Sequence, residues 1–122
     1  MKNVELYYND DRSAYAVLIS PGWGSGWYTD NYSFPEIAYD KEVIAWYSNL
    51  SPEYIDEVKI RGTDANKYAN SLFTSLGYND IYFGGLQENM IRWIPIGSIW
   101  RIRDYDGAEY IEYLDLKEWN QF

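Results

Sequence analysis

The chain has 122 residues, of which 19 are acidic and 10 are basic, so its formal net charge is -9, and it contains no cysteine and no histidine. The two absences exclude a thiol nucleophile, a disulfide, a Cys/His zinc site and any side chain with an ordinary pKa near neutrality. The negative charge disfavours direct binding to DNA and to anionic membranes, because that binding depends on neutralising phosphates.

Length and hydrophobicity predict a single domain over residues 1–122. A chain of this size buries roughly two-thirds of its unfolded surface, and 47% of the residues are hydrophobic, which is ample for a core. No run of 18 apolar residues occurs, and Met1 leads into a strand-like stretch instead of the apolar centre of a signal peptide. We therefore expect no membrane association and a cytoplasmic location.

A hairpin and an irregular loop are predicted at the start of the chain. Two β-prone runs, residues 4–8 and 14–19, flank a polar turn at residues 9–13. Pro21 ends the second run, and glycines then alternate with bulky or polar residues in the Gly-Trp loop, Gly22-Trp23-Gly24-Ser25-Gly26-Trp27. This alternation cannot continue as a regular strand or helix, so a shaped loop is expected.

Two or three helices are predicted in the middle of the chain. The first starts near Ser33, and its apolar face comprises Ile37, Ala38, Val43, Ile44 and Tyr47. The second starts at Ser51, where Pro and Glu suit the first turn. The third begins at Asp64 and stops at Gly77, because helical spacing relates Ala65, Tyr68, Ala69, Leu72, Phe73 and Leu76.

About four antiparallel strands are predicted in the C-terminal third, at residues 80–83, 90–94, 98–105 and 108–114. Asp106-Gly107 is a strong two-residue turn signal, and it fixes a register that runs from Tyr105 opposite Ala108 to Trp100 opposite Tyr113. One face of this hairpin is then apolar: Trp100, Ile102, Ile111 and Tyr113. The other carries Arg101, Arg103, Tyr110 and Glu112, which could form an ion pair and an Arg-on-Tyr stack.

These elements predict an α+β domain. The N-terminal hairpin and the C-terminal strands are expected to join one antiparallel sheet, with the helices packed on one of its faces. A homodimer would cover exposed sheet edges or apolar sheet faces.

Two groups of residues are candidate ligand sites. The backbone N–H groups of the Gly-Trp loop can form an anion-binding nest, while Trp23 and Trp27 offer flat surfaces for a base or sugar; the alternative is a tight corner whose tryptophans pack in the core. The second group is Arg92, Arg101 and Arg103 on neighbouring predicted strands, which could clamp a phosphate or carboxylate. The alternative for these arginines is surface ion pairing with nearby glutamates.

An acidic surface is predicted around the C-terminal hairpin. Its candidate residues are Asp104, Asp106, Glu109 and Glu112, and the predicted register places Asp104 opposite Glu109. The interpretations are a strip of charge that imitates a phosphate backbone, a paired acid and base as in glycoside hydrolysis, a weak cation site, or solvated charge beside a turn. Because calcium-loop spacing is absent, no metal site is predicted, and no cofactor is expected.

Catalytic side chains are scarce. A serine nucleophile would lack a histidine partner, and no Ser-x-x-Lys motif occurs. An enzyme would have to use carboxylates, Tyr or Arg, so a non-catalytic protein is predicted and no catalytic residue is assigned.

Five segments resemble a group of small acidic proteins encoded by phages and prophages of Gram-positive bacteria: residues 21–27, 37–41, 76–82, 94–97 and 104–109. The resemblance implies a setting, an infected or lysogenic bacterium, and a class: non-catalytic antagonists of host defence. Such a protein would occupy a defence protein, imitate DNA, or sequester a small nucleotide signal. The alternatives are a carboxylate-based hydrolase and a structural or replication-associated interaction module of the phage.

Overall fold

The computed structural model describes residues 3–22, 27, 28, 31, 33–50, 72–79, 81 and 89–114. In chain order the elements are β1 (Ala14–Ile19), a 3-10 helix (Pro35–Ala38), α1 (Lys41–Ser48), β2 (Met90–Pro95), β3 (Trp100–Tyr105) and β4 (Ala108–Tyr113). Residues 72–75 are also helical. The predicted α+β class is confirmed.

The four strands form two antiparallel two-stranded sheets, β1 with β2 and β3 with β4, in place of the single sheet that was expected. The polar turn at residues 9–13 is present, with Asn9 N donating to Ala14 O at 3.0 Å. Residues 4–8, however, contribute only an isolated bridge between Tyr8 and Tyr15. β1 forms its ladder with β2 instead, from Ala14 opposite Pro95 to Ile19 opposite Met90.

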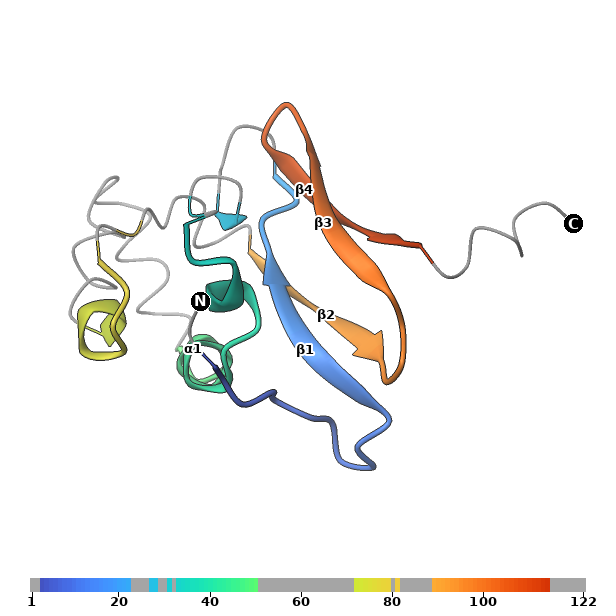
Figure 1. The fold of residues 1–122 in the computed structure, drawn as a ribbon, viewed down its shortest axis with the longest axis horizontal. Coiled ribbons are helices and arrows are strands. Elements are labelled where there is room, and N and C mark those ends of the chain that lie inside the picture. Colours follow the sequence, from blue (N-terminus) through green and yellow to red (C-terminus); the bar gives the residue numbers. More distant parts are fainter. Residues whose placement is uncertain are drawn as a thin grey trace, which may run out of the picture.

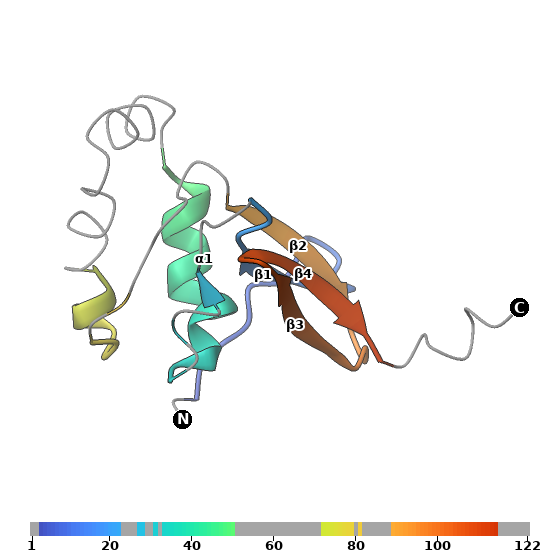
Figure 2. The same cartoon turned by 90° about the horizontal axis from the view of Figure 1, so that it is seen from above.

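The β1–β2 sheet lies between α1 and the β3–β4 hairpin (Figures 1 and 2). Side chains of β1 alternate between the two sides, so Leu18 joins a cluster with Val43 and Ile44 of α1, while Val17 and Ile19 pack towards the hairpin. Because both faces of β1 are covered, its sequence is an unbroken apolar run. Among the described residues, the core is therefore in two parts, one on each side of β1.

Two residues of the described segments mark helix boundaries, one at a start and one at an end. Asp40 caps α1 by accepting from Glu42 N at 2.9 Å, so the predicted first helix is divided into a 3-10 helix and α1. Gly77 ends the next helical segment at φ +93°, with Tyr78 N donating to Phe73 O and Gly77 N to Thr74 O. The predicted second helix and the start of the third lie outside the described residues, as does most of the strand predicted at 80–83.

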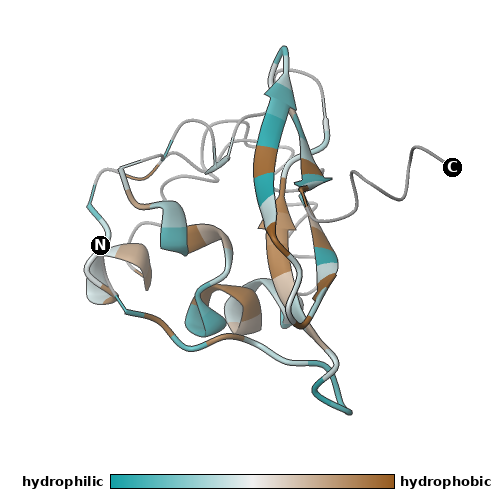
Figure 3. Cartoon of the chain, turned by 45° about the vertical axis from the view of Figure 1, so that its right-hand side comes forward, coloured by the Kyte–Doolittle hydropathy of each residue, from teal (hydrophilic) through white to brown (hydrophobic). Residues whose placement is uncertain are grey.

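The C-terminal hairpin has the predicted register at all six positions, from Tyr105 opposite Ala108 to Trp100 opposite Tyr113. Asp106 and Gly107 have φ of 53° and 88°, the left-handed pair that a tight hairpin turn requires. Figure 3 shows hydrophilic and hydrophobic residues in bands along the hairpin, with hydrophilic residues at its tip. The hydrophobic side, which includes Ile102 and Ile111, packs against Val17, Ile19 and Ile94.

Candidate ligand-binding site

The Gly-Trp loop contributes one described tryptophan, Trp27, whose side chain is fully buried. Its ring lies 5.9 Å from that of Phe73, and its Nε1 donates to Leu18 O at 3.0 Å. This corrects the prediction that Trp27 is a ligand-binding residue, because a core ring offers no exposed face. The remaining candidates of the loop, residues 23–26, lie outside the described part of the chain.

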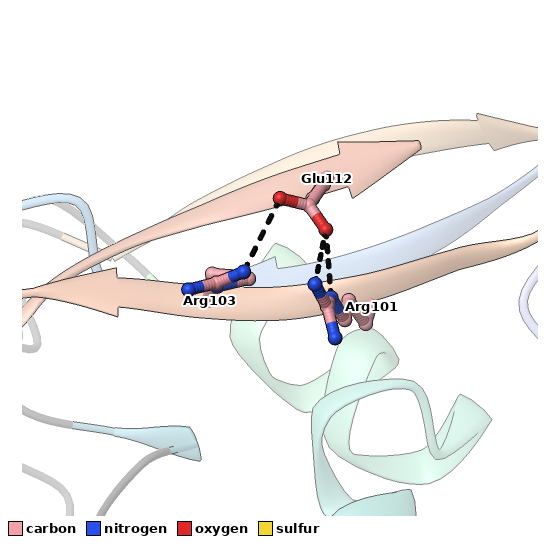
Figure 4. A network of polar contacts seen from close by, with 3 residues as sticks. All are labelled: Arg101, Arg103 and Glu112. Carbon is pink, nitrogen blue, oxygen red and sulfur yellow. Dashed lines mark hydrogen bonds and ion pairs between the residues drawn. The ribbon is translucent and has the colours of Figure 1, made fainter. Parts of the chain in front are cut away.

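Two of the three candidate arginines come together on the outer face of β3. Arg101 contacts Glu112 through Nε and Nη2, both at 2.7 Å from Oε1, and Arg103 Nη1 lies 3.5 Å from Oε2 (Figure 4). The predicted cross-strand ion pair is thus present. Arg92 is exposed on β2, in the other two-stranded sheet, so the predicted three-arginine set is divided between two sheets.

The prediction that Glu109 belongs to an acidic surface is wrong, because the residue is only 2% exposed. Its carboxylate accepts from Ser20 N at 2.9 Å and from Trp27 N at 3.3 Å, which joins β4 to the end of β1. Glu112 is engaged by the two arginines, while Asp104 and Asp106 are exposed near the turn. The four carboxylates therefore do not form one acidic strip.

An open pocket of about 440 Å³ lies between β1, β3 and the 3-10 helix. Half of its lining residues are aromatic, and the lining comes from distant parts of the chain: Leu6, Tyr15, Tyr28, Pro35, Tyr39, Trp100, Arg101 and Ile102. All of these side chains are half-buried except that of Arg101, which is exposed. We call this feature the aromatic pocket. Of these residues, only Arg101 was predicted from the sequence to bind a ligand.

Trp100 fixes the geometry of the aromatic pocket. Its ring meets Tyr39 edge to face, with ring centroids 6.2 Å apart and planes at 87°, and its Nε1 donates to the hydroxyl oxygen of Tyr15. The Tyr15 and Trp100 rings are 6.3 Å apart and tilted by 51°. The three rings thus hold one another in place, so that a ligand would meet a preformed aromatic wall.

The hydroxyl group of Tyr39 is a neutral hydrogen-bonding group at physiological pH. Burial raises the pKa of Tyr39 above its ordinary value of 10.0, and the neighbouring Glu36, Tyr28 and Tyr15 raise it further. Tyr39 therefore keeps its proton throughout the physiological range. Among the described lining residues of the aromatic pocket, Arg101 contributes the positive charge.

Other kinds of site find no support in the described residues. Within the ranges given above, no group of three or more Asp or Glu side chains is placed to hold a metal ion. The same residues include no helix long and apolar enough to cross a membrane. No protein family, curated protein or solved structure matches the chain. The fold and site define an α+β protein with an aromatic pocket.

Proposed function

We propose that this protein is a non-catalytic binding protein whose aromatic pocket takes a nucleotide-class ligand, a flat base joined to an anionic phosphate. One observation carries the proposal: Tyr15, Tyr39 and Trp100 converge with Arg101 around one open space. Aromatic rings stack on nucleobases, and a guanidinium binds phosphate. The same pocket thus offers both groups that such a ligand needs.

Size and stiffness agree with this ligand class. Small-molecule pockets commonly have volumes of about 300–1,000 Å³, and the aromatic pocket, at about 440 Å³, falls in that range. Base stacking on an aromatic side chain contributes about 1–3 kcal/mol. Because Trp100 is already held by contacts with Tyr15 and Tyr39, little of this energy is lost in ordering the rings.

Arg101 supplies the attraction for an anion in a chain of net charge -9. The contacts with Glu112 use its Nε and Nη2, and Figure 4 shows a further guanidinium nitrogen directed away from Glu112. Arginine carries five N–H donors, so donors remain for a phosphate at the rim of the pocket. Glu112 meanwhile limits the conformations that the arginine can adopt.

The biological role that we propose is antagonism of a bacterial defence system through sequestration of a nucleotide signal. The resemblance to small acidic phage proteins supports the setting, and the aromatic pocket supports this mechanism over the occupation of a defence protein. The burial of Glu109 does not favour the alternative hydrolase in the form that uses the Asp104 and Glu109 pair, because an acid and a base must both be accessible to a substrate.

Calorimetric titration with adenosine, guanosine and cyclic dinucleotide phosphates tests the proposal. We expect binding to the unmodified protein, and Arg101→Gln should weaken it about tenfold or more, because it removes a charge-assisted hydrogen bond. Arg103→Gln is the matched control, since Arg103 also contacts Glu112 but does not line the pocket. The affinity of Arg103→Gln for each nucleotide should stay within about twofold of that of the unmodified protein, as expected for a surface charge outside the pocket.

Two outcomes would contradict the proposal. One is the absence of binding of every nucleotide tested at millimolar concentration. The other is equal weakening by Arg101→Gln and Arg103→Gln, which would indicate attraction by the whole outer face of the hairpin instead of binding in the aromatic pocket.

A further inference from the structure

β3 has an open edge on the side away from β4. Glu109, which lies opposite Asp104, directs its N–H away from β3 and donates to Ser20 O at 2.8 Å. Such outward-directed pairs alternate along an antiparallel ladder, so Asp104, Ile102 and Trp100 direct their N–H and C=O groups away from β4. Among the described residues, no backbone hydrogen bond reaches these groups. An edge of this kind is a template for a further strand.

The aromatic pocket borders this open edge. Its lining includes Trp100, Arg101 and Ile102, three successive residues of β3. Successive side chains of a strand point to opposite faces, so a space that borders all three lies along the edge of β3. Tyr15 of β1 and Tyr39, which follows the 3-10 helix, line the same space. The open backbone groups therefore lie beside an aromatic pocket.

Two arginines occupy the outer face of β3, immediately before and after Ile102 in the sequence. The side chains of Arg101 and Arg103 are 53% and 46% exposed. Their contacts with Glu112 use Nε and Nη2 of Arg101 and Nη1 of Arg103 (Figure 4). Because a guanidinium carries five N–H donors, both arginines retain donors for further carboxylates.

We propose that the open edge of β3 binds an extended acidic segment of another protein as an added strand, in which one aromatic residue stands between two acidic residues. The aromatic residue lies opposite Ile102, exchanges both backbone hydrogen bonds with it and shares its face, so that its ring enters the aromatic pocket. The two acidic residues lie opposite Arg101 and Arg103 and accept charge-assisted hydrogen bonds from them. Backbone bonds give an added strand its affinity, and the alternating side chains give its specificity.

Charge disfavours a second copy of this chain as the occupant. If two β3 edges paired antiparallel about Ile102, Arg101 of each copy would lie opposite Arg103 of the other. Like charges directly opposite one another destabilise a sheet. An acidic segment makes both of these pairs attractive, so the edge selects that partner over itself.

The ring of the acidic segment and the base of a nucleotide would use the same space in the aromatic pocket. The two ligands therefore exclude one another, and each is measured in the absence of the other. They also differ in the arginines that they need. The nucleotide depends on Arg101 and not on Arg103, whereas the acidic segment depends on both.

Fluorescence anisotropy with three labelled, end-blocked peptides tests the inference. The probe is Thr-Val-Glu-Phe-Glu-Val-Thr. The second peptide has the same composition in the order Thr-Val-Phe-Glu-Glu-Val-Thr, and the third is the probe with the backbone nitrogen of its phenylalanine methylated. The unmodified protein should bind the probe at least about tenfold more tightly than either, because the second peptide loses one charge-assisted pair and the third loses a backbone hydrogen bond to Ile102.

Variants of the protein test the charge pairs. Arg101→Gln and Arg103→Gln should each weaken binding of the probe about fivefold or more, because each removes one pair with an acidic residue. Arg92→Gln is the matched control, since Arg92 is also exposed but lies on β2 in the other sheet. The affinity of Arg92→Gln for the probe should stay within about twofold of that of the unmodified protein.

Three outcomes would overturn the inference: no binding of the probe, equal affinity for the probe and for either of the other peptides, or equal weakening by Arg92→Gln and Arg103→Gln. The last would indicate attraction by charge at large instead of pairing along β3. Because nucleotide binding is measured separately and does not require Arg103, each proposal can fail while the other stands.

Discussion

Replacing Glu109 by alanine tests whether its buried carboxylate joins β4 to the end of β1. The Glu109 carboxylate accepts from Ser20 N and Trp27 N, so its removal leaves two backbone N–H groups without that acceptor. A buried donor left unsatisfied costs about 1–3 kcal/mol. The carboxylate's own desolvation cost is relieved at the same time, which offsets part of the loss. We expect the free energy of unfolding to fall by about 2–4 kcal/mol.

The matched variant is Glu112→Ala, three residues along the same strand on the opposite face. Glu112 contacts two arginines, but its side chain is 32% exposed, and exposed ion pairs contribute about 0–1 kcal/mol each. Urea unfolding of both variants gives the comparison, with the midpoint for Glu109→Ala about 1–2 M below that for Glu112→Ala. Equal midpoints would refute the argument that Glu109 is an internal hydrogen-bond acceptor.

Three further predictions concern stability. Gly77→Ala should lower the free energy of unfolding by about 1 kcal/mol in a denaturant titration, because the residue has φ +93° but an added Cβ meets nothing within 4 Å; a loss above about 3 kcal/mol would contradict this. The pKa of Tyr78 is raised above 10.0, mainly by burial and then by its hydrogen bond to Asp40. As the pH rises, the unfolded chain therefore releases this proton before the folded protein does, and the free energy of unfolding should fall above about pH 10. Tyr78→Phe should flatten that fall in unfolding midpoints measured between about pH 8 and 11, and an unchanged pH dependence would count against it. Glu36→Gln should raise the melting temperature without ligand, by an amount equivalent to about 1–2 kcal/mol, because an amide costs less to bury than a carboxyl group that has no hydrogen-bond partner among the described residues; a lower melting temperature would show that the carboxyl group has a stabilising partner.

The C-terminal hairpin could be predicted residue by residue because its turn is local. Asp106-Gly107 adopts the conformation that those two residues favour, and this alone fixes every pair from Tyr105 to Trp100. Because successive side chains of a strand point to opposite faces, Glu109 shares the face of Ile111, two residues further along β4. Glu109 was predicted to be a surface acid because acidic side chains are usually exposed, but its position in the strand places it on the buried face.

The aromatic pocket could not be predicted from sequence, because it depends on contacts between distant residues. Tyr15, Tyr39 and Trp100 come together only when β1 pairs with β2 and the hairpin packs on the other side of β1. The sequence favoured pairing of residues 14–19 with residues 4–8, since the polar turn between them is a local signal. The turn at residues 9–13 is present, but β1 forms its hydrogen-bonded ladder with β2 and not with residues 4–8.

The most direct test of ligand binding in the aromatic pocket is the indole N–H resonance of Trp100, assigned by its loss in Trp100→Phe and followed by NMR during addition of guanosine monophosphate. The indole group of Trp100 donates to Tyr15 within the aromatic pocket, whereas Trp93 is 46% exposed on β2 and lies outside it. We predict a saturable shift of the Trp100 resonance with little change at Trp93. An unshifted Trp100 resonance at saturating ligand, or a shift confined to Trp93, would contradict the account.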